Sequence, residues 1–114
     1  MGLRLALALA MACAGALPSG AVEFTYTADS GKAFYKSCGP ANPHPDTATC
    51  SAYAQSVIGP LVASNSRTVC PPSGVSAQDI STITLSYMRA HPEKLRQPQN
   101  RVILEAMARA YPCG

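Results

Sequence analysis

Residues 70–93 read CPPSGVSAQDISTITLSYMRAHPE, and this stretch decides the fold class. Its double proline, followed by Ser-Gly, is typical of a turn. Ser76, followed three residues later by Asp79, predicts a variant of the capping box in which Asp replaces the usual Glu or Gln. One apolar face follows at helical spacing, made of Ile80, Ile83, Tyr87 and Met88. The His91-Pro92 dipeptide, with an arginine before it, indicates the end of this helix.

The helical pattern continues toward the C-terminus. Pro98 suits the first turn of a last helix, and Pro112 stops that helix. The inner side of the last helix is expected to carry Ile103, Leu104, Met107, Ala110 and Tyr111.

Toward the N-terminus, proline-rich loops separate two further helices. Ser30 is expected to cap a short helix from Gly31 to about Cys38. Its packing residues are predicted to be Ala33, Phe34 and Tyr35. The next stretch, 39–46, contains three prolines and is predicted to be a loop.

A longer helix is expected after this loop, capped by Thr47 or Thr49. Its apolar residues at helical spacing are Cys50, Tyr53, Val57 and Ile58. Gly59-Pro60 is expected to kink or end the helix, with at most another turn before Ser64-Asn65-Ser66 breaks it. The periodicity therefore predicts an all-α fold, a small four-helix array with no internal repeat.

The N-terminal segment has the features of a secretory signal peptide. A short basic start precedes the uncharged apolar run 5–17, which is shorter than the about 20 apolar residues that span a bilayer. Cleavage is expected after Ala16 or Ala21, and the second site is preferred. We therefore expect a signal peptide over 1–21, an extended arm over 22–29, a helical domain over 30–114 and no stable membrane anchor.

The cysteines predict a disulfide framework. Removal of the signal peptide takes Cys13 away and leaves Cys38, Cys50, Cys70 and Cys113. Four cysteines in a short exported chain allow three connectivities. Because the end of one helix lies beside the start of the next in an antiparallel hairpin, helix order favours the pairs Cys38–Cys50 and Cys70–Cys113. No cysteine pair has the short spacing typical of a structural zinc site, so no metal site is predicted.

Charge and composition argue against several function classes. The formal net charge is only +3, and the basic residues are scattered without the stripe or aromatic platforms that bind nucleic acid. His44 and His91 each lie beside a proline, in or near a loop, and are not part of a nucleophilic constellation. No glycine-rich phosphate loop and no paired carboxylates are recognisable. The sequence therefore predicts a protein that is not an enzyme and uses no cofactor.

Several segments occur together in a specific order. They are the C-P-P-S-G-V-S run at 70–76, the Y-M-R-A-H-P-E run at 87–93, the A-Y-P-C run at 110–113, Cys38 at a helix end, and the C-S-A-Y run at 50–53. As a set they resemble the Rap/Tai family, the immunity proteins of type VI secretion amidase effectors. The resemblance covers about Gly31 to Cys113. One departure is Pro60 directly after Gly59, where the helix is expected to run on.

The resemblance implies a periplasmic, all-α, disulfide-bonded protein. Its partner would be a peptidoglycan-cleaving amidase delivered by sister cells, whose active-site cleft it would block. Members of the family also self-associate, so a homodimer is a further expectation. An alternative is a periplasmic acid-stress chaperone, but that mechanism requires acid-titrating groups, and carboxylates and histidines are few here.

Two loops are candidates for the partner surface. The first is the 63–68 loop, in which Ser64, Asn65 and Arg67 offer polar groups, with Arg67 as the expected anchor. The second is the 39–47 loop, stiffened by its three prolines and tethered by the expected Cys38–Cys50 bond.

Overall fold

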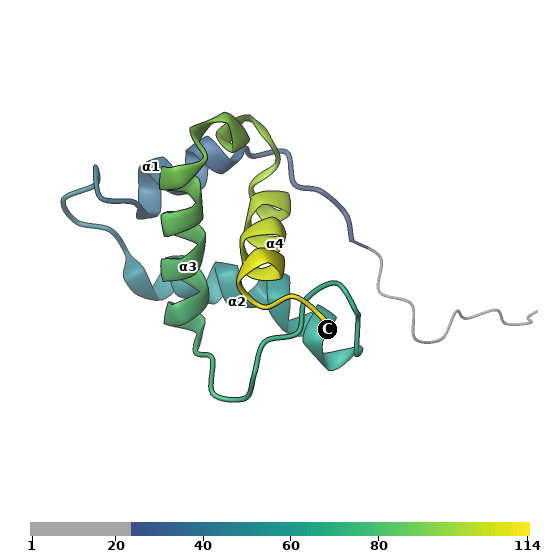
Figure 1. Ribbon diagram of the computed structural model, residues 1–114. Coiled ribbons are helices and arrows are strands. Elements are labelled where there is room, and N and C mark those ends of the chain that lie inside the picture. Colours follow the sequence, from purple (N-terminus) through teal and green to yellow (C-terminus); the bar gives the residue numbers. More distant parts are fainter. Residues whose placement is uncertain (1–23) are drawn as a thin grey trace, which may run out of the picture.

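A computed structural model describes residues 24–114 of the chain. These residues form α1 (Gly31–Cys38), α2 (Thr47–Ala63), α3 (Ala77–Ala90), the 3-10 helix η1 (Pro92–Arg96) and α4 (Gln99–Ala110) (Figure 1). The fold is all-α, as the periodicity predicts. The expected signal peptide, its two cleavage sites and Cys13 lie outside the described residues. Within residues 24–114, no helix has the length and apolar character needed to span a bilayer.

Helix α1 begins without the side-chain cap that the sequence predicts. Ser30 occupies the N-cap position, but its side chain accepts no capping hydrogen bond. The chain is held here from outside the helix, because the backbone N–H of Gly31 donates to the carbonyl of Gln97 at 2.7 Å. Phe34 is buried as predicted, whereas Ala33 is exposed, which corrects its assignment as a packing residue.

The start of α2 differs from the prediction by one residue. The N-cap is Asp46, and not Thr47 or Thr49. Its carboxylate accepts hydrogen bonds from the backbone N–H of Thr49 at 3.1 Å and from the Thr49 hydroxyl at 2.8 Å. Aspartate is among the most favoured N-cap residues, because its carboxylate pairs with N–H groups that have no partner inside the helix. Thr49 is therefore a donor to the cap and not the cap itself.

Pro60 lies inside α2 and does not end it. Proline removes one backbone donor, which leaves the carbonyl of residue 56 without its helical partner. Both Ser56 and Pro60 are exposed, so water can reach that carbonyl. Beyond the proline, Leu61 is buried in the core, and this packing holds the last turn of the helix.

Helix α3 has the predicted capping box, and α4 starts one residue later than predicted. The Ser76 hydroxyl accepts from the Asp79 N–H at 3.0 Å, and the Asp79 carboxylate accepts from the Ser76 N–H at 2.9 Å. Pro98 is the N-cap residue of α4, immediately before its first turn. The 3-10 helix η1, which begins at Pro92, was not predicted.

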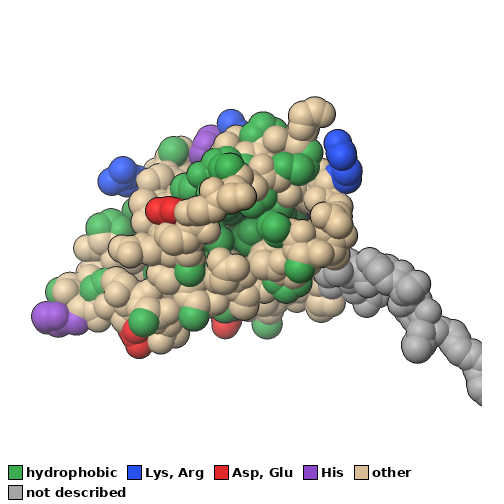
Figure 2. All heavy atoms as spheres, turned by 90° about the horizontal axis from the view of Figure 1, so that it is seen from below, with side chains coloured by type: hydrophobic (Ala, Val, Ile, Leu, Met, Phe, Trp, Pro, Cys, Tyr) green, Lys and Arg blue, Asp and Glu red, His purple; other side chains and the backbone are tan. Residues whose placement is uncertain are grey.

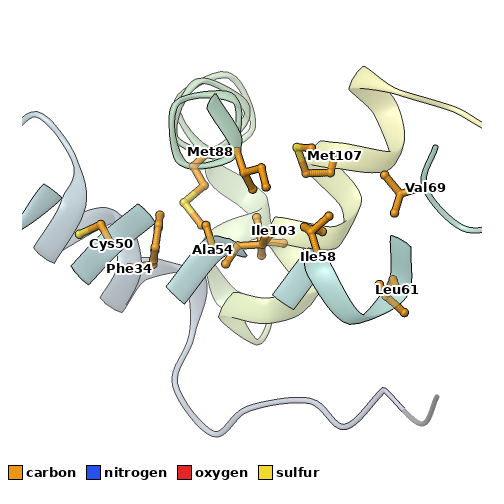
Figure 3. Packing of buried hydrophobic residues seen from close by; sticks show 11 residues of the cluster. Phe34, Cys50, Ala54, Ile58, Leu61, Val69, Met88, Ile103 and Met107 are labelled. Atoms are coloured by element: carbon orange, nitrogen blue, oxygen red, sulfur yellow. The ribbon is translucent and has the colours of Figure 1, made fainter. Parts of the chain in front are cut away.

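The core lies where α2, α3 and α4 meet (Figure 3). Helix α2 contributes a row of buried residues at helical spacing, which are Cys50, Ala54, Ile58 and Leu61. Met88 of α3 faces this row together with Ile103 and Met107 of α4. Full burial of one such large side chain stabilises the fold by about 1.5–3 kcal/mol.

The predicted inner faces are largely right, with two differences. Ile80 and Met88 are buried within the chain, while Ile83 is half-buried. The buried stripe of α3 also includes Ser81 and Thr84, which an apolar pattern does not reveal. Ala110 of α4 is exposed, which corrects its assignment to the inner side. The buried side chains of α4 are Asn100, Val102, Ile103, Ala106 and Met107.

Two disulfides join the cysteines that helix order pairs. Cys38 at the end of α1 bonds Cys50 in α2, across a sequence separation of 12. Cys70, before α3, bonds Cys113, after α4, across a separation of 43. A backbone hydrogen bond supports the second bond, since the N–H of Cys70 donates to the carbonyl of Tyr111 at 2.9 Å.

The segment before α1 is bound to the start of α4. The Thr27 N–H donates to the Asn100 side-chain oxygen at 3.1 Å, and the Asn100 amide donates to the Thr25 carbonyl at 2.8 Å. Asn100 is buried, so it has partners for both ends of its side chain. This attachment places Asp29 beside α4, where the Gln99 N–H donates to its carbonyl at 2.8 Å.

Candidate functional site

The two loops selected from the sequence lie at opposite ends of α2 (Figure 1). The helix has 17 residues, so its ends are about 25 Å apart at about 1.5 Å per residue. Each loop is tied to the rest of the molecule by one disulfide. The structure therefore does not combine them into one local site, and each is considered separately.

Ser64 and Asn65 serve the end of α2. Asn65 has a φ of 59°, in the left-handed region that Asn tolerates better than most residues. Its N–H donates to the Val62 carbonyl at 3.1 Å, and the Ser66 N–H donates to the Leu61 carbonyl at 2.9 Å. This pair of bonds is the Schellman pattern of helix termini. The Ser64 hydroxyl bonds the Leu61 carbonyl at 3.2 Å, so it too is used within the turn.

Arg67 is the residue of this loop whose side chain remains open to a partner. It is exposed, and none of the ion pairs among residues 24–114 includes it. A surface hollow of about 280 Å³ lies beside it, which we call the Arg67 hollow; its lining is Val62, Asn65, Ser66, Arg67, Val69, Cys70 and Pro71. Val62 is 42% exposed, unusually so for a large apolar residue of this protein. An arginine next to an exposed apolar side chain is a combination suited to a protein interface.

The 39–46 loop projects from the body of the molecule between α1 and α2 (Figure 1). Asn42 organises it from within, because its amide donates to the Ser37 carbonyl at 2.6 Å and its side-chain oxygen accepts from the His44 N–H at 3.0 Å. At its base, a Cβ on Gly39 would clash with the Tyr35 carbonyl oxygen, so only glycine fits. The loop is exposed but has a defined internal structure.

A larger hollow of about 500 Å³ lies under this loop, and we call it the proline-loop hollow. Its lining comes from the segment before α1, from α1, from the loop, from α2 and from Gln99 at the start of α4. It includes Asp29, Phe34, Cys38, His44, Asp46, Cys50 and Tyr53. The hydrogen bonds from the Thr49 backbone N–H and the Thr49 hydroxyl hold the pKa of the Asp46 carboxyl below its usual value. Asp46 therefore stays charged to a lower pH than an ordinary aspartate.

Sequence reasoning did not identify two residues of the proline-loop hollow. Asp29 is brought there by the attachment of its segment to α4, a long-range contact without a local signal. Tyr53 was assigned to the apolar face of α2, and its ring does lie near that of Phe34, with centroids 6.2 Å apart. Its hydroxyl, however, is buried and has no hydrogen-bond partner within the described chain.

Several other charged groups form ion pairs or ring contacts with neighbouring side chains at the protein surface. His91 ends α3, where its ring lies 4.6 Å from that of Tyr87 and its Nδ1 atom lies 3.4 Å from the Glu93 carboxylate. Glu105 pairs with Arg101 at 3.2 Å and with Lys94 at 3.9 Å. On the face shown in Figure 2, the Lys and Arg side chains stand apart and form no stripe. Within residues 24–114, no three His, Cys, Asp or Glu side chains are grouped to hold a metal ion.

Comparison with known proteins gives one match. A family model described as Rap1a immunity proteins matches residues 30–113, which includes every helix described above and both disulfides. No curated protein and no solved structure matches the chain.

Proposed function

The chain belongs to the family of Rap1a immunity proteins. From this premise we propose that it acts in the periplasm, where it binds and inhibits a peptidoglycan amidase effector of a type VI secretion system and so protects the cell wall. An immunity protein is a non-enzymatic inhibitor, and the expected mode of action is to occupy the effector's active-site cleft. The family match over residues 30–113 is the observation that carries this proposal.

The covalent framework supports an extracytoplasmic site of action. Disulfides persist in oxidising compartments such as the bacterial periplasm and are rare in the cytosol. Both bonds lie at the margins of helices, Cys38–Cys50 between α1 and α2, and Cys70–Cys113 across the α3–α4 pair. The peptidoglycan substrate of an amidase is in the same compartment, so an inhibitor located there would meet the enzyme where it acts.

Rigidity is the physical requirement for an inhibitor that occupies a cleft. Ordering a flexible side chain or loop on binding costs about 0.5–1.5 kcal/mol per immobilised side chain, so a preorganised surface loses less affinity. The helix terminus at Ser64 and Asn65 and the internal bonds of the 39–46 loop both provide such order.

Arg67 is the proposed anchor residue, with Ser64 and Asn65 as its supporting turn. The Arg67 guanidinium is exposed, carries five N–H donors and lies beside the exposed Val62. In a cleft, the apolar side chain would lose water contact while the guanidinium bonds a carboxylate or carbonyl group of the effector. Because Ile80 and Met88 are buried within the chain, a homodimer would have to form through other residues.

A pull-down tests the proposed function. The exported, oxidised and tagged protein is used as bait in the periplasmic fraction of its native strain. We expect one amidase to be retained with nanomolar affinity, with its cleavage of peptidoglycan blocked by the bait. Retention of many unrelated proteins only at acidic pH would instead support the acid-stress chaperone. A correctly folded bait that retains no amidase would contradict the proposal.

A further inference from the structure

The proline-loop hollow has an unusual charge composition for this basic chain. The net charge is +3, yet the titratable side chains that line the hollow are Asp29, Asp46, His44 and Tyr53, with no Lys or Arg among the described lining residues. Lys36 lines a different hollow, which shares Ser37 and Asn42 with this one. Two acidic residues therefore line this hollow without a Lys or Arg from the described part of the chain.

The other carboxylates of residues 24–114 are already used. Asp79 closes the capping box of α3, Glu93 lies beside His91, and Glu105 pairs with two basic residues. Asp46 accepts two hydrogen bonds from Thr49, one at each oxygen, and Asp29 has no ion-pair partner within the described chain. Since a carboxylate has about four acceptor sites, both retain capacity for a further donor.

The Asp46 carboxylate and the Asp29 backbone are held in place before any partner arrives. The Asp29 carbonyl accepts from the Gln99 N–H at 2.8 Å and from the Thr27 hydroxyl at 3.1 Å, which anchors the backbone of this residue. The capping bonds from Thr49 fix the Asp46 side chain. A partner would therefore not have to order the Asp46 side chain or the Asp29 backbone, which favours binding.

The rest of the lining is suited to the apolar part of a long side chain. It includes the Phe34 and Tyr53 rings and the sulfur atoms of the Cys38–Cys50 bond. Long basic side chains bury their methylene groups against such surfaces and keep the charged head at polar groups.

We propose that the proline-loop hollow receives an arginine side chain of the effector, which pairs with Asp29 and Asp46. This inference rests on the proposed function and adds a second contact at the other end of α2 from Arg67. Arginine is favoured over lysine because its planar guanidinium offers five donors to two carboxylates and stacks on aromatic rings. The two contacts have opposite charge, so together they define the orientation of the effector on the inhibitor.

The test removes the two charges without removing the helix cap. The double variant Asp29→Asn/Asp46→Asn is made in the exported, oxidised protein, because Asn caps a helix about as well as Asp. Asp79→Asn is the matched control, since it neutralises an N-terminal carboxylate of a helix away from the hollow. Thermal unfolding of each variant verifies the fold, and calorimetry measures affinity for the amidase retained in the pull-down.

We expect the double variant to bind that amidase at least about tenfold more weakly, and Asp79→Asn to bind within about twofold of the wild type. The charge reversal Asp29→Lys should weaken binding further. If the wild type binds the amidase and the double variant binds equally well, the arginine pocket is wrong and the proposed function stands. If the folded wild type does not bind the amidase, the proposed function fails and this inference fails with it.

Discussion

The two ends of α2 are built by different means. At its N-terminal end, Asp46 caps the helix and the Cys38–Cys50 bond closes a loop between residues only 12 apart. At its C-terminal end, the turn at Asn65 leads into a segment that the Cys70–Cys113 bond joins to the end of the chain, across 43 residues. The first end depends on contacts close in sequence, whereas the second depends on the docking of α4.

The two ends also differ in charge. Asp29 and Asp46 line the proline-loop hollow, while Arg67 lines the other one. A partner that contacts both ends must present groups of opposite sign about 25 Å apart, the length of α2. At the C-terminal end stability and recognition are separate, because the Arg67 side chain takes no part in the turn at Asn65. At the N-terminal end Asp46 serves both, because its carboxylate caps α2 and also lines the hollow.

The largest predicted effect concerns the two disulfides. In the loop-closure model, removing the Cys70–Cys113 bond by alanine substitution lowers the free energy of unfolding by about 4 kcal/mol, and removing Cys38–Cys50 lowers it by about 3 kcal/mol. The longer loop loses more because its closure restricts the unfolded chain more strongly. Urea denaturation of both double variants measures the difference.

Unfolding under reducing conditions is the control for the disulfides, since both bonds are then broken in every variant. Cys50 is buried and Cys70 is exposed, so replacing cysteine by alanine removes different amounts of side-chain packing at the two bonds. The stability that a variant loses under reducing conditions measures this packing alone. The additional loss under oxidising conditions measures the bond. A larger bond-specific loss at Cys38–Cys50 would contradict the contrast between the two ends.

Arg67→Ala is expected to affect binding and not folding. Since Arg67 is the proposed anchor of the interface, its removal should weaken binding to the effector by about 2 kcal/mol, which is the usual threshold for a hot spot. Its midpoint of unfolding should stay unchanged, because the side chain is exposed and forms no ion pair among residues 24–114. Arg101→Ala, which removes an arginine paired with Glu105, is the matched control and should leave affinity unaffected.

Asn65→Ala tests the turn that presents Arg67. Alanine pays a steric cost at a positive φ, so the free energy of unfolding should fall by about 1 kcal/mol. Asn65→Gly should be neutral or slightly stabilising, because glycine adopts this conformation freely. Thermal unfolding of the pair measures both effects; equal losses for both would show that the Asn65 side chain, and not its backbone, holds the turn.

The smallest predicted effect is the pH dependence at the other end. Hydrogen bonds from Thr49 lower the pKa of Asp46 in the folded state from the ordinary value of 3.8. A lowered pKa means that this group stabilises the fold above its unfolded pKa and that this contribution is lost as pH falls through the folded pKa. Asp46→Asn should therefore reduce the loss of thermal stability below about pH 4. A melting temperature with the same acid dependence in wild type and variant would contradict this role.

Local rules predicted most of the helical framework. The capping box of Ser76 and Asp79 was recognisable because both partners lie within one turn of sequence. The predictions failed where a competing residue or a distant contact decided the outcome. Asp46 displaced Thr47 and Thr49 as the cap since its carboxylate bonds both the N–H and the hydroxyl of Thr49. By contrast, the continuation of α2 beyond Pro60 to Ala63 lies within the expected further turn, and the burial of Leu61 holds that turn.

The candidate surfaces were only partly predictable. The two loops could be chosen from their composition. The disulfide pairs could be predicted from the order of the helices, because in an antiparallel pair one helix ends beside the start of the next. The separate roles of Ser64, Asn65 and Arg67 could not be distinguished from the sequence. Neither the left-handed backbone conformation of Asn65 nor the exposure of the Arg67 guanidinium produces a periodic pattern of residues.

By itself, the sequence determined the all-α class, the approximate helix bounds and the cysteines available for pairing, because caps, prolines and helical periodicity act over a few residues. Only the tertiary structure decided that Asp29 and Asp46 line the same hollow, that the two loops occupy opposite ends of α2, and that Tyr53 has a buried hydroxyl without a partner in residues 24–114. These features arise from the docking of α4 and of the segment before α1, held by contacts such as that of Thr27 with Asn100, 73 residues apart. Contacts of this length depend on how whole faces pack together, and no local pattern encodes them.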